Sequence, residues 1–342
     1  MPILIRNSSQ FSRLHGVGAL AALLVAACGG GGGGSSVNTP AYTLNSKADA
    51  IREVANVAAL LADLDPNQAG FAPGDAGPVT SATGPATQTD SSNPATTNNC
   101  RDGGSESDAD VATNHTFQYF TPVVQITNND GLKSSFSGCT VKSGGSAYVY
   151  DGYAEEGQGT DDASDTYSYL RAGLENDPSS EYRIQFVSGT SETLRLRGLI
   201  ERVDLGNQLV QKTQGLSYIF SEDVGQQKAQ YQASLGSSGN DFTIQSPAPG
   251  TFTIDGPLSY SSSAASCLNA SLLLKTATAL VVDSHGVPNS GELDITAGSA
   301  KANVIFSASG AQAQFADGHS EMISSTELAT AIGANPCRNV VN

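Results

Sequence analysis

The stretch ETLRLRGLIERV, residues 192–203, decides the fold. Apolar and charged side chains alternate along it, so an extended chain would place them on opposite faces. The apolar face carries Leu194, Leu196 and Ile200, and the polar face carries Arg195, Arg197 and Glu201. This alternation predicts a half-buried strand in an antiparallel sheet.

Runs of the same period extend from residue 100 toward the C-terminus. The expected strands are 117–126, 132–142, 146–153, 166–171, 181–187, 192–203, 208–220, 227–235, 241–245, 251–255, 267–282, 292–297, 301–308 and 311–315. No helical pattern alternates with them, which excludes βαβ units. So many strands exceed what a flat open sheet carries. We therefore expect a mainly β domain over 100–342, built as a large curved antiparallel sheet or as a barrel-like or sandwich wrap.

Two turns are predicted from their residue types. Asn128-Asn129-Asp130-Gly131 carries a strong hairpin signal between two of the expected strands. Pro247-Ala248-Pro249-Gly250 predicts a second hairpin farther along the chain.

An amphipathic helix is expected over 46–64, with helical residues 47–64. Ser46 and Asp49 resemble a capping box at its start, and Ile51, Val54 and Leu61 recur at helical spacing. Its apolar stripe needs a partner, and one face or open end of the sheet is the expected one. A second, short helix is expected over 326–332, with Ser325 as its cap.

Residues 65–99 are low in complexity, rich in Pro, Gly, Ser, Thr and Asn. Such a composition buries too little apolar surface to offset the entropy of ordering. The segment is expected to be a loop or an extended strip along a sheet edge, and the composition leaves both open.

The N-terminus reads as a secretory signal. Arg6 and Arg13 precede an apolar run over 17–27 that is too short to span a bilayer stably. The residues Val25-Ala26-Ala27-Cys28 resemble the lipobox of bacterial lipoproteins. That resemblance implies that residues 1–27 are removed and that Cys28 is lipidated as the new N-terminus.

The segment 28–45 continues that resemblance, because Cys28 is followed by the run Gly29–Gly34, a flexible tether familiar among proteobacterial lipoproteins. In that family an Asp directly after the cysteine is associated with retention in the inner membrane. Gly29 stands there instead, which implies an outer-membrane lipid anchor. Whether the body faces the periplasm or the exterior stays open.

The net charge restricts the partners. Residues 1–27 hold two of the 17 basic residues and none of the 33 acidic ones, so the remaining chain has a net charge of −18. An acidic surface disfavours nucleic acid and anionic lipid head groups. The expected partners are the membrane, through the anchor, and a lipid, glycan or protein ligand.

Four further cysteines are expected to form two disulfides in the oxidising exported compartment: Cys100, Cys139, Cys267 and Cys337. Three pairings are open. We favour Cys100–Cys139 and Cys267–Cys337, because each pair brackets one block of expected strands. No C-x-x-C spacing exists and no His lies within four residues of a Cys, which argues against a thiolate metal site.

One acidic cluster is a candidate cation loop on a long hairpin connection: Asp151, Glu155, Glu156, Asp161, Asp162 and Asp165. Oxygen-rich loops of this kind bind hard cations. The spacing does not match the EF-hand pattern, however, and crowded surface acids are usually just hydrated.

No catalytic motif accompanies His115, His285 or His319, so we expect no enzyme and no cofactor. The predicted function is a non-catalytic envelope lipoprotein that binds or carries a lipid, a glycan or a protein. The alternatives are a structural envelope component without a small ligand and an unrecognised envelope hydrolase. A cavity of several hundred Å³ would favour a carrier, and a packed interior would favour the structural component.

Overall fold

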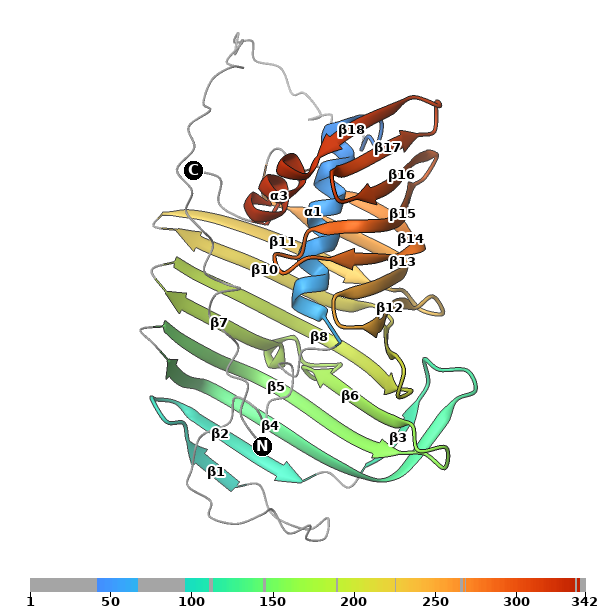
Figure 1. The fold of residues 1–342 in the computed structure, drawn as a ribbon. Coiled ribbons are helices and arrows are strands. Elements are labelled where there is room, and N and C mark those ends of the chain that lie inside the picture. The colour runs from blue at the N-terminus through green and yellow to red at the C-terminus, as the bar shows by residue number, and fades with distance from the viewer. Residues whose placement is uncertain are drawn as a thin grey trace, which may run out of the picture. The chain divides into compact units, whose positions relative to one another are not determined.

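The computed structural model describes residues 42–66, 96–110, 113–143, 146–188, 190–224, 226–264, 267, 269–335 and 337–338. Within these residues, eighteen strands form one antiparallel sheet, accompanied by two α-helices (Figure 1). The predicted mainly β fold with a curved antiparallel sheet and two helices is confirmed.

The first nine strands are β1 (Thr96–Asn99), β2 (Ser105–Asp110), β3 (Thr113–Phe117), β4 (Val124–Ser143), β5 (Ser146–Thr160), β6 (Thr166–Ala172), β7 (Tyr182–Ser188), β8 (Thr190–Asp204) and β9 (Leu209–Thr213). The others are β10 (Leu216–Val224), β11 (Gln227–Leu235), β12 (Phe242–Ala248), β13 (Thr251–Ser262), β14 (Ala270–Val282), β15 (Pro288–Ala297), β16 (Ala300–Ser307), β17 (Gly310–Phe315) and β18 (Ser320–Ser324).

Several long strands of the sheet each pair along one edge with two shorter strands. The strand β8 pairs along one edge with β6 and β7 and along the other with β9 and β10. Beyond them, β13 pairs with both β12 and β11. At three positions in the sheet, two shorter strands thus take the place of one long strand: β6 with β7, β9 with β10, and β12 with β11. The breaks between them let the sheet bend part-way along its length.

Two glycines mark this bend. Gly152 (φ +88°) lies where the partner of β5 changes from β6 to β7, and Gly256 (φ +127°) lies where the partner of β13 changes from β12 to β11. A Cβ at Gly152 would lie 2.0 Å from the Glu181 carbonyl oxygen, and one at Gly256 would lie 2.2 Å from that of Asp241. Only glycine fits where the backbones approach so closely.

The helix α1 (Lys47–Leu64) has the predicted bounds. The Ser46 hydroxyl accepts a hydrogen bond from the Asp49 N–H, which caps its first turn. Its apolar side packs on one face of the sheet, against residues of β12, β13 and β14 (Figure 1). Each large apolar side chain buried in this way stabilises the fold by roughly 1.5–3 kcal/mol.

The C-terminal helix α3 (Ser325–Ala334) packs against α1. Its cap is Ser324 and not the predicted Ser325. The reason is a capping box: Ser324 accepts from the Glu327 N–H while the Glu327 carboxylate accepts from Ser324. Gly333, expected just beyond the helix, lies within its last turn.

An arm formed by β3 and the start of β4 covers the opposite face of the sheet. A buried cluster joins the arm to β6, β8 and β9: Phe117, Ile126, Tyr167, Tyr169, Leu199, Val203 and Val210. Residues 192–203 were predicted to form a half-buried strand with one face exposed to solvent. Its second half is instead buried on both faces, because the arm covers the face that carries Glu201.

The predicted hairpin at Asn128–Gly131 is wrong, because these residues lie inside β4. The partner of β4 changes there, from β3 at Asn129 to β2 at Leu132, while β5 pairs continuously with Asp130 and Gly131. Pairing with a long neighbour therefore overrides the local turn preference. The second predicted hairpin is confirmed between β12 and β13.

Three further differences follow from weak local patterns. The expected strand 208–220 is two strands, β9 and β10, and the expected strand 117–126 is interrupted at 118–123 by the connection between β3 and β4. The strands β1, β2 and β18 were not predicted, since their sequences TTNN, SESDAD and SEMIS hold few apolar residues. The low-complexity segment 65–99 ends in the strand β1, which lies at the edge of the sheet and pairs with β2. Residues 67–95 lie outside the described part of the chain.

Candidate functional sites

Cys28, the predicted lipidation site, lies outside the described residues, as do all of residues 1–41. Among the described residues, no helix combines the length and the apolar character that crossing a bilayer requires.

Both predicted disulfides are confirmed. Cys100–Cys139 joins the end of β1 to β4 with a Cα–Cα distance of 5.4 Å, and Cys267–Cys337 joins the start of β14 to the chain after α3 at 5.5 Å. Closing loops of this length typically stabilises a fold by about 2–4 kcal/mol.

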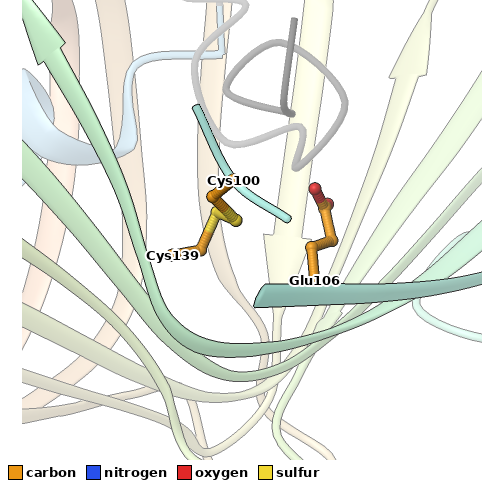
Figure 2. A group of neighbouring side chains, drawn as sticks. All are labelled: Cys100, Glu106 and Cys139. Carbon is orange, nitrogen blue, oxygen red and sulfur yellow. A yellow bond between two sulfur atoms is a disulfide. The ribbon is translucent and has the colours of Figure 1, made fainter. Parts of the chain in front are cut away.

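A carboxylate accompanies the first disulfide. Figure 2 shows Glu106 of β2 beside Cys100 and Cys139, and potential ligand atoms of the three lie within 4.8 Å of one another. Burial, followed by the charge of Asp108, raises the pKa of Glu106 to about 7. Sulfurs joined in a disulfide are not thiolate ligands, so the group is a buried acid beside a covalent link.

The six acidic residues of the candidate cation loop do not converge. The predicted long loop is wrong, since β5 runs to Thr160 and places Asp151, Glu155 and Glu156 within a strand. Only Asp161, Asp162 and Asp165 occupy the turn. Apart from the group in Figure 2, no trio of Cys, His, Asp or Glu in the described residues gathers its ligand atoms within 4.8 Å.

Several of these acids already have protein donors. Asp151 accepts from the Gly138 N–H at 2.7 Å and pairs with Arg183. The two oxygens of Glu155 accept from the hydroxyls of Tyr153 (2.7 Å) and Tyr169 (2.9 Å). Burial and the hydrogen bond to Glu155 raise the pKa of Tyr153.

The arm is held by a second buried carboxylate, Glu201 of β8, which sequence reasoning did not single out. Its side chain accepts from the N–H groups of Gln118 (3.2 Å) and Tyr119 (2.9 Å), and His115 Nε2 lies 3.1 Å from Oε1. The His115 ring stacks on Tyr169 at a centroid distance of 3.9 Å. Both oxygens of Glu201 thus contact residues of the arm, which fixes the arm to β8.

The other two histidines lie in exposed turns. Asp283 Oδ1 accepts from the His285 and Val287 N–H groups, and Asp317 Oδ1 accepts from the His319 N–H. An Asp side chain that accepts from the N–H two residues on is typical of a tight turn.

The most polar part of the interior lies between α1 and the sheet. Glu53 is fully buried and accepts from the Tyr260 hydroxyl at 2.7 Å, while Asp63 accepts from Tyr218 and pairs with Arg338. Burial opposes the charge of Arg338, but Asp63, Tyr218 and Tyr231 together outweigh this effect and raise the pKa of the guanidinium. Spacing alone did not predict this cluster, because Arg338 arrives from the far end of the chain.

The remaining space under α1 is small. A narrow cleft with no room for a water-sized molecule is lined by residues of the helix and of β12, β13 and β14: Val57, Leu60, Leu61, Phe242, Ile244, Ile254 and Leu274. A lipid-sized ligand needs several hundred Å³. The helix itself occupies the face that a carrier would have kept open.

No protein-family model, curated protein or solved structure matches this chain.

Proposed function

We propose that the chain is a non-catalytic lipoprotein of a bacterial envelope whose β body acts through its surface, as a structural or protein-binding module. The observation that carries this proposal is the close packing of α1 against β12, β13 and β14. Leu60 and Leu61 of the helix lie against Phe242 and Ile244, where a hydrophobic ligand would otherwise bind.

The small size of the cleft beneath α1 supports the structural alternative over the carrier. A lipid carrier requires an enclosed apolar space that an acyl chain can enter. The cleft beneath α1 is far below that size.

Two carboxylates whose oxygens accept from groups of this chain support a non-catalytic role. Glu155 and Glu201 each direct both oxygens at donors of this chain. A general base needs an oxygen within reach of a substrate proton. Both groups are therefore assigned to structural cohesion.

The proposed anchor is the acylated sulfur of Cys28. Two or more acyl chains hold a protein stably on a bilayer, at about 0.8 kcal/mol per buried CH₂. Gly29, in place of Asp, favours the outer membrane. The tether over 28–45 would leave the acidic body free to meet a protein partner.

The anchor is tested by metabolic labelling with an alkyne fatty acid in a Gram-negative host. The wild-type chain should incorporate label and enter the detergent phase, and Cys28→Ser should lose both properties. Cys100→Ser/Cys139→Ser is the matched control and should keep its label. An unlabelled wild-type chain that retains residues 1–27 would contradict the proposal.

A further inference from the structure

Three residues near the C-terminus form a buried strap over the α1 side of the sheet: Asn335, Cys337 and Arg338. Asn335 Nδ2 donates to the Ala55 carbonyl of α1 at 3.1 Å. The Cys337 carbonyl accepts from Ser262 Oγ at 2.6 Å, and its sulfur is bonded to Cys267. The strap is therefore fastened to the helix, to β13 and, covalently, to the start of β14.

The guanidinium of Arg338 lies among two aromatic rings and a carboxylate. Its Cζ lies 3.9 Å from the ring centroid of Phe220 and 5.7 Å from that of Tyr218. Its Nη2 donates to Asp63 Oδ2 at 2.6 Å. An aromatic face combined with a carboxylate is the combination that recognises a planar guanidinium.

An aromatic row continues this setting toward Glu53. The Tyr231 ring lies edge-on to Tyr218, with centroids 6.3 Å apart, and stacks on Tyr260 at 5.3 Å. The Tyr260 hydroxyl then donates to Glu53. The row thus links the acid that Arg338 occupies to a second acid, Glu53, which pairs with Arg52 at 2.8 Å.

Several buried polar atoms around Arg338 and along the aromatic row have no hydrogen-bond partner. Arg338 Nε finds no acceptor, and Glu53 Oε2, the Asn56 amide and the Tyr231 hydroxyl are buried without a hydrogen-bond partner. A buried polar group without a partner costs about 1–3 kcal/mol. The interior beneath the strap therefore keeps polar atoms that the strap does not satisfy.

We propose that the pocket formed by Asp63, Tyr218 and Phe220 is a binding site for the guanidinium of an arginine side chain, occupied in cis by Arg338. Opening of Cys267–Cys337 releases the strap, and the pocket then accepts an arginine from a cationic protein partner. In this step a dithiol reductant gives two electrons and two protons to the disulfide, yielding two protein thiols and an oxidised reductant. The site does not depend on lipidation of Cys28.

The pocket is tested by chemical rescue with the disulfide intact. Arg338→Ala should melt below the wild-type chain, and millimolar methylguanidinium should raise its melting temperature saturably by several degrees. Methylammonium, a cation that is not planar, should rescue at least fivefold less at equal concentration. Wild type and the double variant Arg338→Ala/Asp63→Asn should not respond. Absence of rescue, or equal rescue of the double variant, would overturn the assignment.

Strap release is tested by calorimetric titration of the full chain with N-acetyl-arginine amide. Cys267→Ser/Cys337→Ser should bind the probe at least tenfold more tightly than the oxidised wild type, with one site per chain. The matched variant Cys100→Ser/Cys139→Ser keeps the strap fastened and should behave as wild type. Equal affinity in all three chains, or unfolding of the strap-released variant in circular dichroism, would overturn the release step.

Discussion

Buried carboxylates organise the places where distant parts of this chain meet. Glu201 gathers the arm on one face of the sheet, and Glu53 and Asp63 connect α1 to β13, β10 and the C-terminus on the other. Such groups are expensive to bury unless every oxygen has a donor. Their contribution is therefore most visible when a single partner is removed.

Glu201→Ala should lower the free energy of unfolding by about 2–4 kcal/mol, because it leaves two backbone N–H groups of the arm without an acceptor. Urea denaturation measures this loss, and hydrogen exchange should show faster exchange at Gln118 and Tyr119. Glu175→Ala, at an exposed position, is the control and should change stability by less than about 0.5 kcal/mol. A wild-type midpoint for Glu201→Ala would refute the role of this acid.

Glu106 should make stability depend on pH. Its pKa is about 7 in the folded chain against an ordinary 4.5, so the folded state holds the proton over this interval while the unfolded state has lost it. The contribution of Glu106 to stability is therefore complete below pH 4.5 and is lost as the pH rises through 7. Glu106→Gln should equal wild type at pH 4 and be more stable by roughly 1–2 kcal/mol at pH 8. Equal denaturation midpoints at pH 8 would contradict this expectation.

The elements depend on two kinds of sequence feature, an apolar stripe in α1 and glycines at the bend of the sheet. The stripe could be read directly from the spacing of Val54, Ala58 and Leu61. The bend could not, because a glycine within a strand pattern does not reveal which backbone approaches it.

Leu60→Ala in α1 should cost about 2–4 kcal/mol, since the side chain is 2% exposed and its removal enlarges the cleft beneath the helix. Leu273→Ala, on the outer side of β14 and 52% exposed, is the matched control and should cost less than about 1 kcal/mol. Guanidinium denaturation followed by circular dichroism compares the two. Equal losses would show that α1 does not close the core.

Gly256→Ala should prevent the bend in β13, because its Cβ would lie 2.2 Å from a backbone oxygen. Gly206→Ala provides the control: Gly206 has a similarly positive φ of +77°, but nothing lies within 4 Å of its added Cβ. We expect a loss of about 1 kcal/mol at Gly206 and at least twice that, or insoluble expression, at Gly256. Indistinguishable melting temperatures would argue against a steric bend.

At the scale of the whole molecule, the features that could be predicted are those encoded by residues close together in the sequence. The two-residue alternation, the helix over 47–64 and the bracketing of strands by cysteines led to the β class, the covering helix and the disulfide pairing. Contacts between segments that are distant in the sequence could not be predicted from it. The hairpin expected at Asn128–Gly131 failed because β5 pairs across it, and neither the Glu201 cluster nor the Arg338 pocket has a signature in spacing.

The most direct test of the account is native mass spectrometry of the whole protein released from a bacterial envelope in mild detergent. We predict the mass of residues 28–342 with two disulfides and the acyl groups of Cys28, and no further bound molecule, because α1 already fills the sheet. A stoichiometric additional lipid that persists under gentle activation would contradict the filled interior and restore the carrier hypothesis.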